Sequence, residues 1–146
     1  MEKSVNLKNI FMDEFGLAEQ DLRTYSPLTL AYIGDAIFEL VVRTVLVERK
    51  NMQPEKLHKA ATKIVKAETQ AVMIEVLKEE LTEEELAVFK RGRNAKAVTR
   101  AKNASMSEYR RATGFEALMG YLYLKGDVER MIKLISLGVQ KAEVTL

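Results

Sequence analysis

The stretch LAYIGDAIFEL, residues 30–40, decides the fold class, because it is helical in pattern and carries two acids. Ser26 followed by Pro27 predicts the N-terminus of this helix, since serine caps helices and proline fits their first turn. Asp35 and Glu39 lie on a helix face that is otherwise apolar. Ionised carboxylates are costly in an apolar interior unless they are paired, hydrogen-bonded or bound to a metal. We therefore expect both acids to be buried for a functional reason.

The rest of the chain repeats this helical spacing of apolar residues, and no segment alternates in the manner of a strand. The 146 residues suffice for one domain with a sizeable core, so we expect a single all-α domain over residues 1–146. About five to seven helices are predicted, and the apolar spacing covers residues 7–15, 27–49, 54–78, 82 to the RGRN at 91–94, 105–126 and 128–142. One long irregular segment remains, at about 92–106.

Composition narrows the classes of protein that this chain can be. It has no cysteine, which excludes disulfides and thiolate zinc sites. The N-terminus lacks the apolar core of a signal peptide, and the most apolar segment is too short to span a membrane. We expect a soluble, cytoplasmic protein with no membrane partner.

The net charge of +2 hides a strong asymmetry between two parts of the chain. Residues 90–111 carry eight basic side chains and one acid, Glu108, so this stretch has a charge of +7 and the remainder −5. The basic residues are Lys90, Arg91, Arg93, Lys96, Arg100, Lys102, Arg110 and Arg111. Such clustering indicates an anionic partner, with nucleic acid first, although a solvated helix face or loop gives the same pattern.

A second acid-bearing helix surrounds Glu116, where small residues and Gly120 lie on the same face. Gly34 stands beside Asp35 and lowers helix propensity, which a close approach of another backbone would justify. If these helices pack closely, Asp35 and Glu116 meet, and their charges repel unless a cation lies between them. Oxygen ligands favour Mg²⁺ or Mn²⁺. The alternative is that both acids form ordinary pairs with nearby Arg or Lys.

Two motifs together resemble the ribonuclease III family. LAYIGDA resembles its first signature, and TGFEALMGYLYL, at 113–124, resembles the second, in the family's order. The resemblance extends over about residues 28–140 and implies the all-α ribonuclease III catalytic domain, with Asp35 and Glu116 as catalytic metal ligands. Two of the family's four carboxylates are replaced here, by Ala31 and Thr113.

These two replacements, with RGRNAK at 91–96, resemble the short branch called Mini-ribonuclease III. That branch has the catalytic domain alone, and too few residues follow the last predicted helix here for a double-stranded RNA-binding domain. The resemblance implies a cytoplasmic, homodimeric, Mg²⁺-dependent endoribonuclease, with Mn²⁺ as a possible substitute, that cuts double-stranded RNA. The branch's known role is maturing the 5′ and 3′ ends of precursor 23S ribosomal RNA.

The duplex must then be held by the catalytic domain, through phosphates and 2′-hydroxyls. The residues expected to do so are Lys90, Arg91, Arg93, Lys96, Arg100 and Lys102. Glu39 is expected to have a structural or dimer-contact role, with an outer-shell contact to the metal as the alternative. Because Ala31 and Thr113 remove two acids, a catalytically silent double-stranded RNA-binding protein of the same fold is the principal alternative function. A helical adaptor that binds an acidic protein ranks last, because it leaves the paired motifs unexplained.

Overall fold

The structure, a computed structural model, describes residues 6–95 and 105–146. Within these ranges it has seven α-helices, two short 3-10 helices and no strand, which confirms the all-α prediction. The elements are α1 (Leu7–Phe15), η1 (Leu22–Thr24), α2 (Pro27–Arg49), α3 (Pro54–Val65), α4 (Ala67–Leu77), η2 (Lys78–Glu80), α5 (Glu83–Asn94), α6 (Met106–Lys125) and α7 (Val128–Lys141). No helix of the described part is long and apolar enough to cross a membrane.

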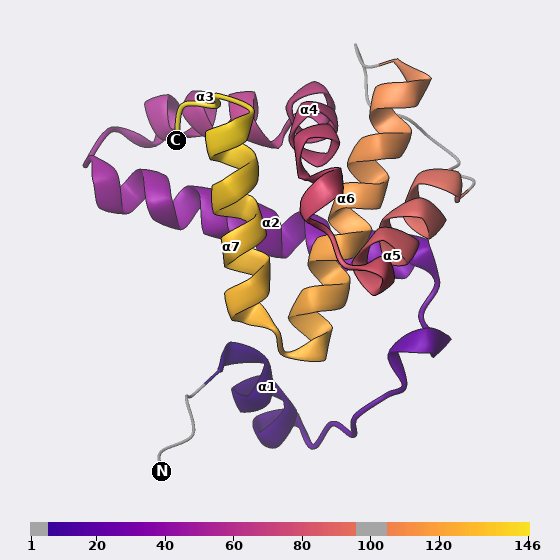
Figure 1. Cartoon of the computed structure of the whole chain (residues 1–146). Coiled ribbons are helices and arrows are strands. Elements are labelled where there is room, and N and C mark those ends of the chain that lie inside the picture. The colour runs from indigo at the N-terminus through magenta and orange to yellow at the C-terminus, as the bar shows by residue number, and fades with distance from the viewer. Residues whose placement is uncertain (1–5, 96–104) are drawn as a thin grey trace.

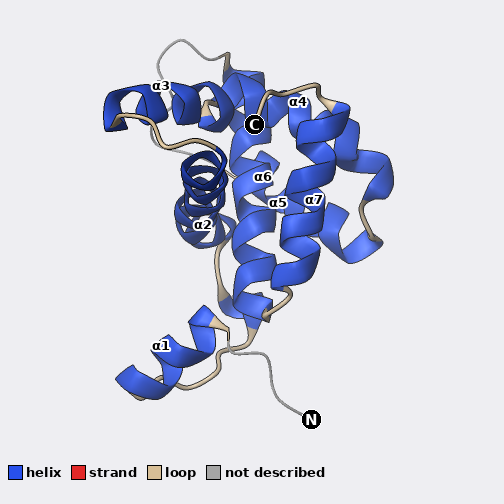
Figure 2. Cartoon of the chain, turned by 90° about the vertical axis from the view of Figure 1, so that its left-hand side faces the viewer, coloured by secondary structure: helices blue, strands red, loops and turns tan. Residues whose placement is uncertain are grey.

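Helix α6 is the centre of the molecule, and α2 crosses it while α4, α5 and α7 pack around it (Figure 1). Eleven of its twenty residues are buried, which makes it the main contributor to the core. Helix α1 lies apart from this bundle, below the ends of α6 and α7 (Figure 2). None of its residues is buried.

The crossing of α2 and α6 depends on two glycines. A Cβ on Gly34 would overlap the carbonyl oxygen of Glu116 and lie 2.8 Å from the backbone nitrogen of Gly120. A Cβ on Gly120 would in turn overlap the carbonyl oxygen of Leu30. The expected close approach of a backbone at Gly34 is therefore confirmed, because the two helices touch through their main chains.

Local signals for helix ends are confirmed at three places. Ser26 caps α2, and its hydroxyl accepts a hydrogen bond from the backbone N–H of Thr29 at 3.1 Å. Thr82 and Glu85 form a capping box at the start of α5. Ser105 forms another with Glu108 at the start of α6. These caps satisfy N–H groups that the first turn of a helix leaves without partners.

One expectation about helix boundaries is wrong. The single helix predicted over 54–78 is divided at Lys66, which has extended backbone angles (φ −66°, ψ 155°) between α3 and α4. The total of seven α-helices in the described part lies within the expected five to seven. Helix α5 ends at Asn94, within the RGRN at 91–94 where its end was expected.

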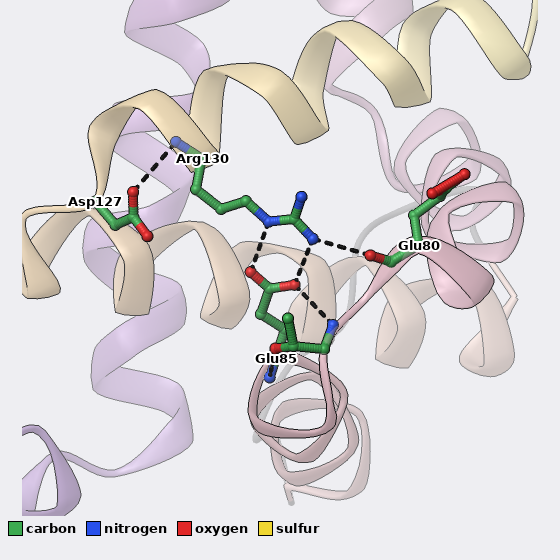
Figure 3. Close-up of polar contacts among 5 residues, drawn as sticks. Glu80, Glu85, Asp127 and Arg130 are labelled. Atoms are coloured by element: carbon green, nitrogen blue, oxygen red, sulfur yellow. Dashed lines mark hydrogen bonds and ion pairs between the residues drawn. The ribbon is translucent and has the colours of Figure 1, made fainter.

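The N-terminus of α5 is joined to α7 by an ion pair that the sequence did not reveal. Arg130 donates from Nε to Oε2 of Glu85 and from Nη2 to Oε1, each at 2.8 Å. Its Nη2 also donates to the carbonyl oxygen of Glu80 at 2.9 Å, and Asp127 caps its backbone N–H (Figure 3). The paired guanidinium lowers the pKa of the buried Glu85 below its ordinary value of 4.5.

Candidate active site

The α2–α6 crossing brings the carboxyl groups of Asp35 and Glu116 next to each other, as expected if these two helices pack closely. The contact follows from the position of each acid beside a glycine contact, since Asp35 follows Gly34 and the Glu116 carbonyl faces that glycine. Burial of the Glu116 carboxyl, and then the adjacent charge of Asp35, raise the pKa of Glu116 from 4.5 to about 8. The two acids thus form a site in which full ionisation is unfavourable without a positive charge.

The expectation that Asp35 is buried is wrong. Its side chain is exposed, and those of Glu39 and Glu116 are partly exposed. The face of α2 that enters the core consists of Leu30, Ala31, Gly34, Phe38, Val42 and Leu46. Asp35 lies at the edge of that face, so the crossing with α6 covers one side of it and leaves the other open to a substrate.

The charges of Asp35 and Glu116 are not neutralised by ion pairs with described lysine or arginine side chains. Across residues 6–95 and 105–146, no lysine or arginine forms a salt bridge with Asp35 or Glu116. Glu39, by contrast, pairs with Arg43 one turn further along α2. The charge at the contact between Asp35 and Glu116 is therefore not neutralised by the described part of the chain.

The two positions where the family's acids are missing lie in the core beside this contact. Ala31 and Thr113 are each 7% exposed. The hydroxyl of Thr113 donates to the carbonyl oxygen of Tyr109 at 3.0 Å, so it is engaged by its own helix. No group of three or more His, Cys, Asp or Glu side chains with metal-binding geometry occurs in the described ranges. At this contact α2 and α6 contribute one carboxylate each, Asp35 and Glu116.

Sequence reasoning missed a third polar residue at this contact, Gln70 on α4. Its side-chain Nε2 donates to Oε2 of Glu116 at 3.2 Å, and its Oε1 is buried without a hydrogen-bond partner. No motif contains this residue, and it lies 46 positions from Glu116 in the chain. The donor set of two carboxylates and one unsatisfied amide oxygen fits a hard cation such as Mg²⁺, which takes oxygen ligands and retains several waters.

Three of the basic residues expected to bind RNA, Lys90, Arg91 and Arg93, lie on the last turns of α5, next to the segment of α6 that carries Glu116. A Cβ on Gly92 would lie 2.8 Å from Cβ of Ala117 and 2.9 Å from Cα of Gly114, so α5 packs directly on this segment. Lys90 and Arg91 are exposed, and the guanidinium of Arg93 lies 5.6 Å from the Phe89 ring centroid. Lys96, Arg100 and Lys102 lie outside the described residues.

An open polar hollow of about 640 Å³ lies beside Arg93. It is lined by Glu75, Lys78, Arg93, Asn94, Met106, Ser107, Arg110 and Arg111. Four of these are basic and one is acidic. Lys78 was not among the expected RNA-binding residues, because it comes from η2, well before the basic stretch of the sequence.

Comparisons with known proteins agree with this architecture. A model of the ribonuclease III domain matches residues 28–127. Mini-ribonuclease 3 of Clostridium tetani is 44% identical over 138 residues, which cover 94% of this chain and 91% of that protein. Mini-ribonuclease 3 of Enterococcus faecalis is 46% identical, with 86% and 97% covered.

Among solved structures, the crystal structure of a protein from Fusobacterium nucleatum superimposes with a TM-score of 0.76 at 34% identity. That match covers 86% of this chain and 99% of the other. The ribonuclease III fold expected from the two motifs is thereby confirmed. The chain belongs to the ribonuclease III family of endoribonucleases, in its Mini-ribonuclease 3 branch.

Proposed function

We propose that this endoribonuclease is Mg²⁺-dependent and cuts double-stranded RNA, with Asp35 and Glu116 as its metal-binding and catalytic residues. The observation that carries the proposal is the contact between these two carboxylates, which the described chain leaves without a cation. Two acids forced together in this way are favourable only when a positive charge neutralises them. A divalent ion supplies that charge.

The chain's own residues divide the work of phosphodiester hydrolysis. Asp35, which is exposed, meets the substrate side of the site, and Glu116 anchors the inner side. A bound Mg²⁺ would activate water and neutralise charge on the phosphoryl and leaving oxygens, which removes the need for a protein general base. The missing acids at Ala31 and Thr113 leave one ion firmly held, with a second ion bound only when RNA supplies further oxygens.

Phosphate binding is assigned to the basic residues at the end of α5 and in the stretch that follows it. Lys90, Arg91 and Arg93 lie on the helix that packs, through Gly92, against the segment of α6 beside Glu116. Lys96, Arg100 and Lys102 extend the same positive charge in the sequence. Since phosphates and 2′-hydroxyls dominate duplex RNA recognition, this surface needs charge more than base-specific contacts.

A homodimer is proposed because apolar side chains remain exposed along α2 beside Asp35. Tyr32 is 82% exposed, Leu40 is 48% exposed and Leu28 is 39% exposed. This exposed apolar face of α2 indicates a protein interface. A second copy paired through a two-fold axis would provide two sites, one for each strand of a duplex.

The natural substrate and compartment follow from the family. We assign the chain to maturation of the 5′ and 3′ ends of precursor 23S ribosomal RNA in the cytoplasm, the role of the Mini-ribonuclease III branch. The charge asymmetry of the sequence supports an RNA substrate.

The decisive experiment is cleavage of a long RNA duplex by the purified protein, with Mg²⁺ or EDTA, beside an Asp35→Asn variant. We expect cleavage that requires Mg²⁺ and falls at least about 1,000-fold in the variant, equivalent to about 4 kcal/mol of transition-state stabilisation. Full activity in EDTA or in Asp35→Asn would contradict the proposal. Tight duplex binding without cleavage under any divalent ion would instead establish the silent RNA-binding alternative.

The RNA surface is tested by the salt dependence of duplex binding in an Arg91→Ala, Arg93→Ala, Lys96→Ala variant. Loss of up to three phosphate contacts should weaken binding and reduce the slope of log K against log salt by up to about 3. The matched control replaces the same number of exposed lysines on α3, Lys56, Lys59 and Lys63. An unchanged slope in the α5 variant would remove this assignment.

The dimer is tested by sedimentation equilibrium of Tyr32→Asp. A charge in the centre of the apolar face should shift the protein towards monomer, because it leaves an unpaired carboxylate at the interface. Ile132→Asp is the control, since Ile132 is a comparably apolar side chain, 41% exposed, on α7. A monomeric wild-type protein, or an unchanged dimer in Tyr32→Asp, would refute this interface.

A further inference from the structure

Gln70 joins three helices at the carboxylate pair. It lies in the first turn of α4 and is 1% exposed. Its Nε2 donates to the carbonyl oxygen of Val65, at the end of α3, at 2.7 Å, and to Oε2 of Glu116 at 3.2 Å. The side chain of Glu116 is therefore held by a residue that is itself fixed by the α3–α4 corner.

The orientation of the Gln70 amide is determined by its neighbours. The backbone oxygen of Val65 can only accept a hydrogen bond, so the amide nitrogen must face it. Oε1 is bonded to the same carbon as Nε2, the atom that donates to the Glu116 carboxylate. This oxygen is buried and has no hydrogen-bond partner among the described residues. A buried acceptor without a donor is unfavourable, which points to a donor other than the described residues.

We propose that Gln70 is a positioning residue for the divalent cation: its Nε2 orients the Glu116 carboxylate, and its Oε1 accepts a hydrogen bond from a water of the hydrated ion. The proposal rests on the proposed function, because it requires an ion at Asp35 and Glu116. Mg²⁺ keeps several of its waters when it binds few protein ligands, so donors for Oε1 accompany it. Residues that hold a metal ligand by hydrogen bonds typically change metal affinity when they are replaced.

The test compares Gln70→Met with Thr69→Val in the full-length protein. Methionine matches glutamine in size but makes neither hydrogen bond, and valine removes the Thr69 hydroxyl that donates to the Lys63 carbonyl at 2.6 Å. Both substitutions thus loosen the α3–α4 corner, but only the first touches Glu116. Free Mn²⁺ is measured by electron paramagnetic resonance during titration, and the Mg²⁺ concentration for half-maximal cleavage is measured separately. Thermal unfolding of both variants reports their stability.

We expect Gln70→Met to weaken Mn²⁺ binding about 10- to 100-fold and to raise the half-maximal Mg²⁺ concentration similarly. The KM for duplex RNA at saturating Mg²⁺ should remain within about twofold, and Thr69→Val should bind Mn²⁺ like the wild type. Equal Mn²⁺ binding in wild type and Gln70→Met would overturn the inference. Equal weakening in both variants would also overturn it, because the loss would then come from the corner alone.

Two further variants, Asp35→Asn and Gln70→Glu, separate a failure of this inference from a failure of the proposed function or of folding. If the wild type binds no more Mn²⁺ than Asp35→Asn, the proposed function fails, which is distinct from a failure confined to Gln70. If Gln70→Met does not fold, Gln70→Glu replaces it, since that variant keeps the size and the acceptor oxygen. A carboxylate at this position should tighten Mn²⁺ binding, because it adds negative charge beside the ion. Unchanged affinity in Gln70→Glu would place the side chain away from the ion and overturn the inference.

Discussion

Two glutamates of this protein occupy similar interhelical positions with opposite electrostatic outcomes. Glu85, between α5 and α7, receives two hydrogen bonds from Arg130 at 2.8 Å, and its pKa lies below 4.5. Glu116, between α6 and α2, contacts Asp35 instead, and its pKa is raised to about 8. The first contact is complete within the chain. The second has no positively charged partner among the described residues.

The difference shows what holds each pair together. Attraction between Glu85 and Arg130 itself favours the α5–α7 contact. Asp35 and Glu116 repel, so their contact is maintained by the main-chain packing of α2 on α6 at Gly34 and Gly120. The proposed cation site is thus supported by glycines rather than by its own charges.

The largest effect should come from breaking that glycine contact with Gly34→Ala. The new Cβ overlaps the Glu116 carbonyl oxygen, so the helices must separate, and we expect a loss of more than about 4 kcal/mol of stability. Urea unfolding measures it. Ala87→Ser, which adds one atom at an exposed helical position, is the control. Because alanine raises helix propensity by up to about 1 kcal/mol over glycine, a more stable Gly34→Ala would mean that the helices do not touch there.

The next effect should follow from Arg130→Met, which breaks the other contact. It leaves the Glu85 carboxylate buried without its cation, and we expect a loss of about 2 to 3 kcal/mol. That figure is below the cost for a fully buried pair because the Arg130 side chain is 29% exposed. Lys141→Met is the control on the same helix, since the lysine pairs only with Glu79 and Glu80 at the surface. The Mg²⁺ concentration needed for cleavage should not change in Arg130→Met. A change would mean that the Glu85–Arg130 pair and the Asp35–Glu116 contact are not independent of each other.

The two glutamates should also respond to pH with opposite signs. The lowered pKa of Glu85 means that its contribution is present above 4.5 and is lost as pH falls through the lowered value. Between 4.5 and about 8, folded Glu116 binds more protons than unfolded Glu116, so its contribution to stability falls as pH rises. A divalent cation should cancel this second loss, because it favours the ionised carboxylate.

Glu116→Gln isolates this smaller effect. Without divalent ions at pH 8, we expect the variant to be more stable than wild type by about 1 to 2 kcal/mol. The full shift from 4.5 to about 8 at about 1.4 kcal/mol per pKa unit sets the upper limit, and the expected effect is smaller because the exposed Asp35 side chain can move away from an ionised Glu116. At pH 4, where both forms are uncharged, the difference should vanish. Mg²⁺ should raise the melting temperature of wild type alone. Equal pH dependence of the two proteins would contradict the raised pKa of Glu116.

The sequence was sufficient to predict contacts that motifs and small residues encode. Asp35, Glu116 and the close approach at Gly34 are adjacent in two recognisable segments, so their meeting followed from helix geometry. The exposure of Asp35 was not predictable in the same way. The spacing of apolar residues defines the buried face of a helix only approximately. A small rotation of the helix about its axis decides whether a residue such as Asp35 lies in the core or at its edge.

Other features depend on contacts that no local pattern records. The division at Lys66 lies in a segment whose apolar spacing continues and which has no proline or glycine at that point. Nothing in the sequence distinguishes Gln70 from any other glutamine in a helix. Its contact with Glu116 exists only in the folded chain. Arg130 and Glu85 are 45 residues apart, and several other basic residues were equally available partners. Pairing of this kind is decided by tertiary packing.

A third acid provides the smallest test of the comparison. Glu39 lies one turn after Asp35, but its partner is Arg43, and both side chains are substantially exposed. An exposed i, i+4 pair is worth about 0.3 to 0.5 kcal/mol, so Glu39→Gln should change stability by no more than that. Its Mg²⁺ requirement should match that of wild type, because a carboxylate paired within the chain needs no external cation. A clear shift in half-maximal Mg²⁺ would show that Glu39 leaves Arg43 for the ion, and would make it part of the site rather than of the surface.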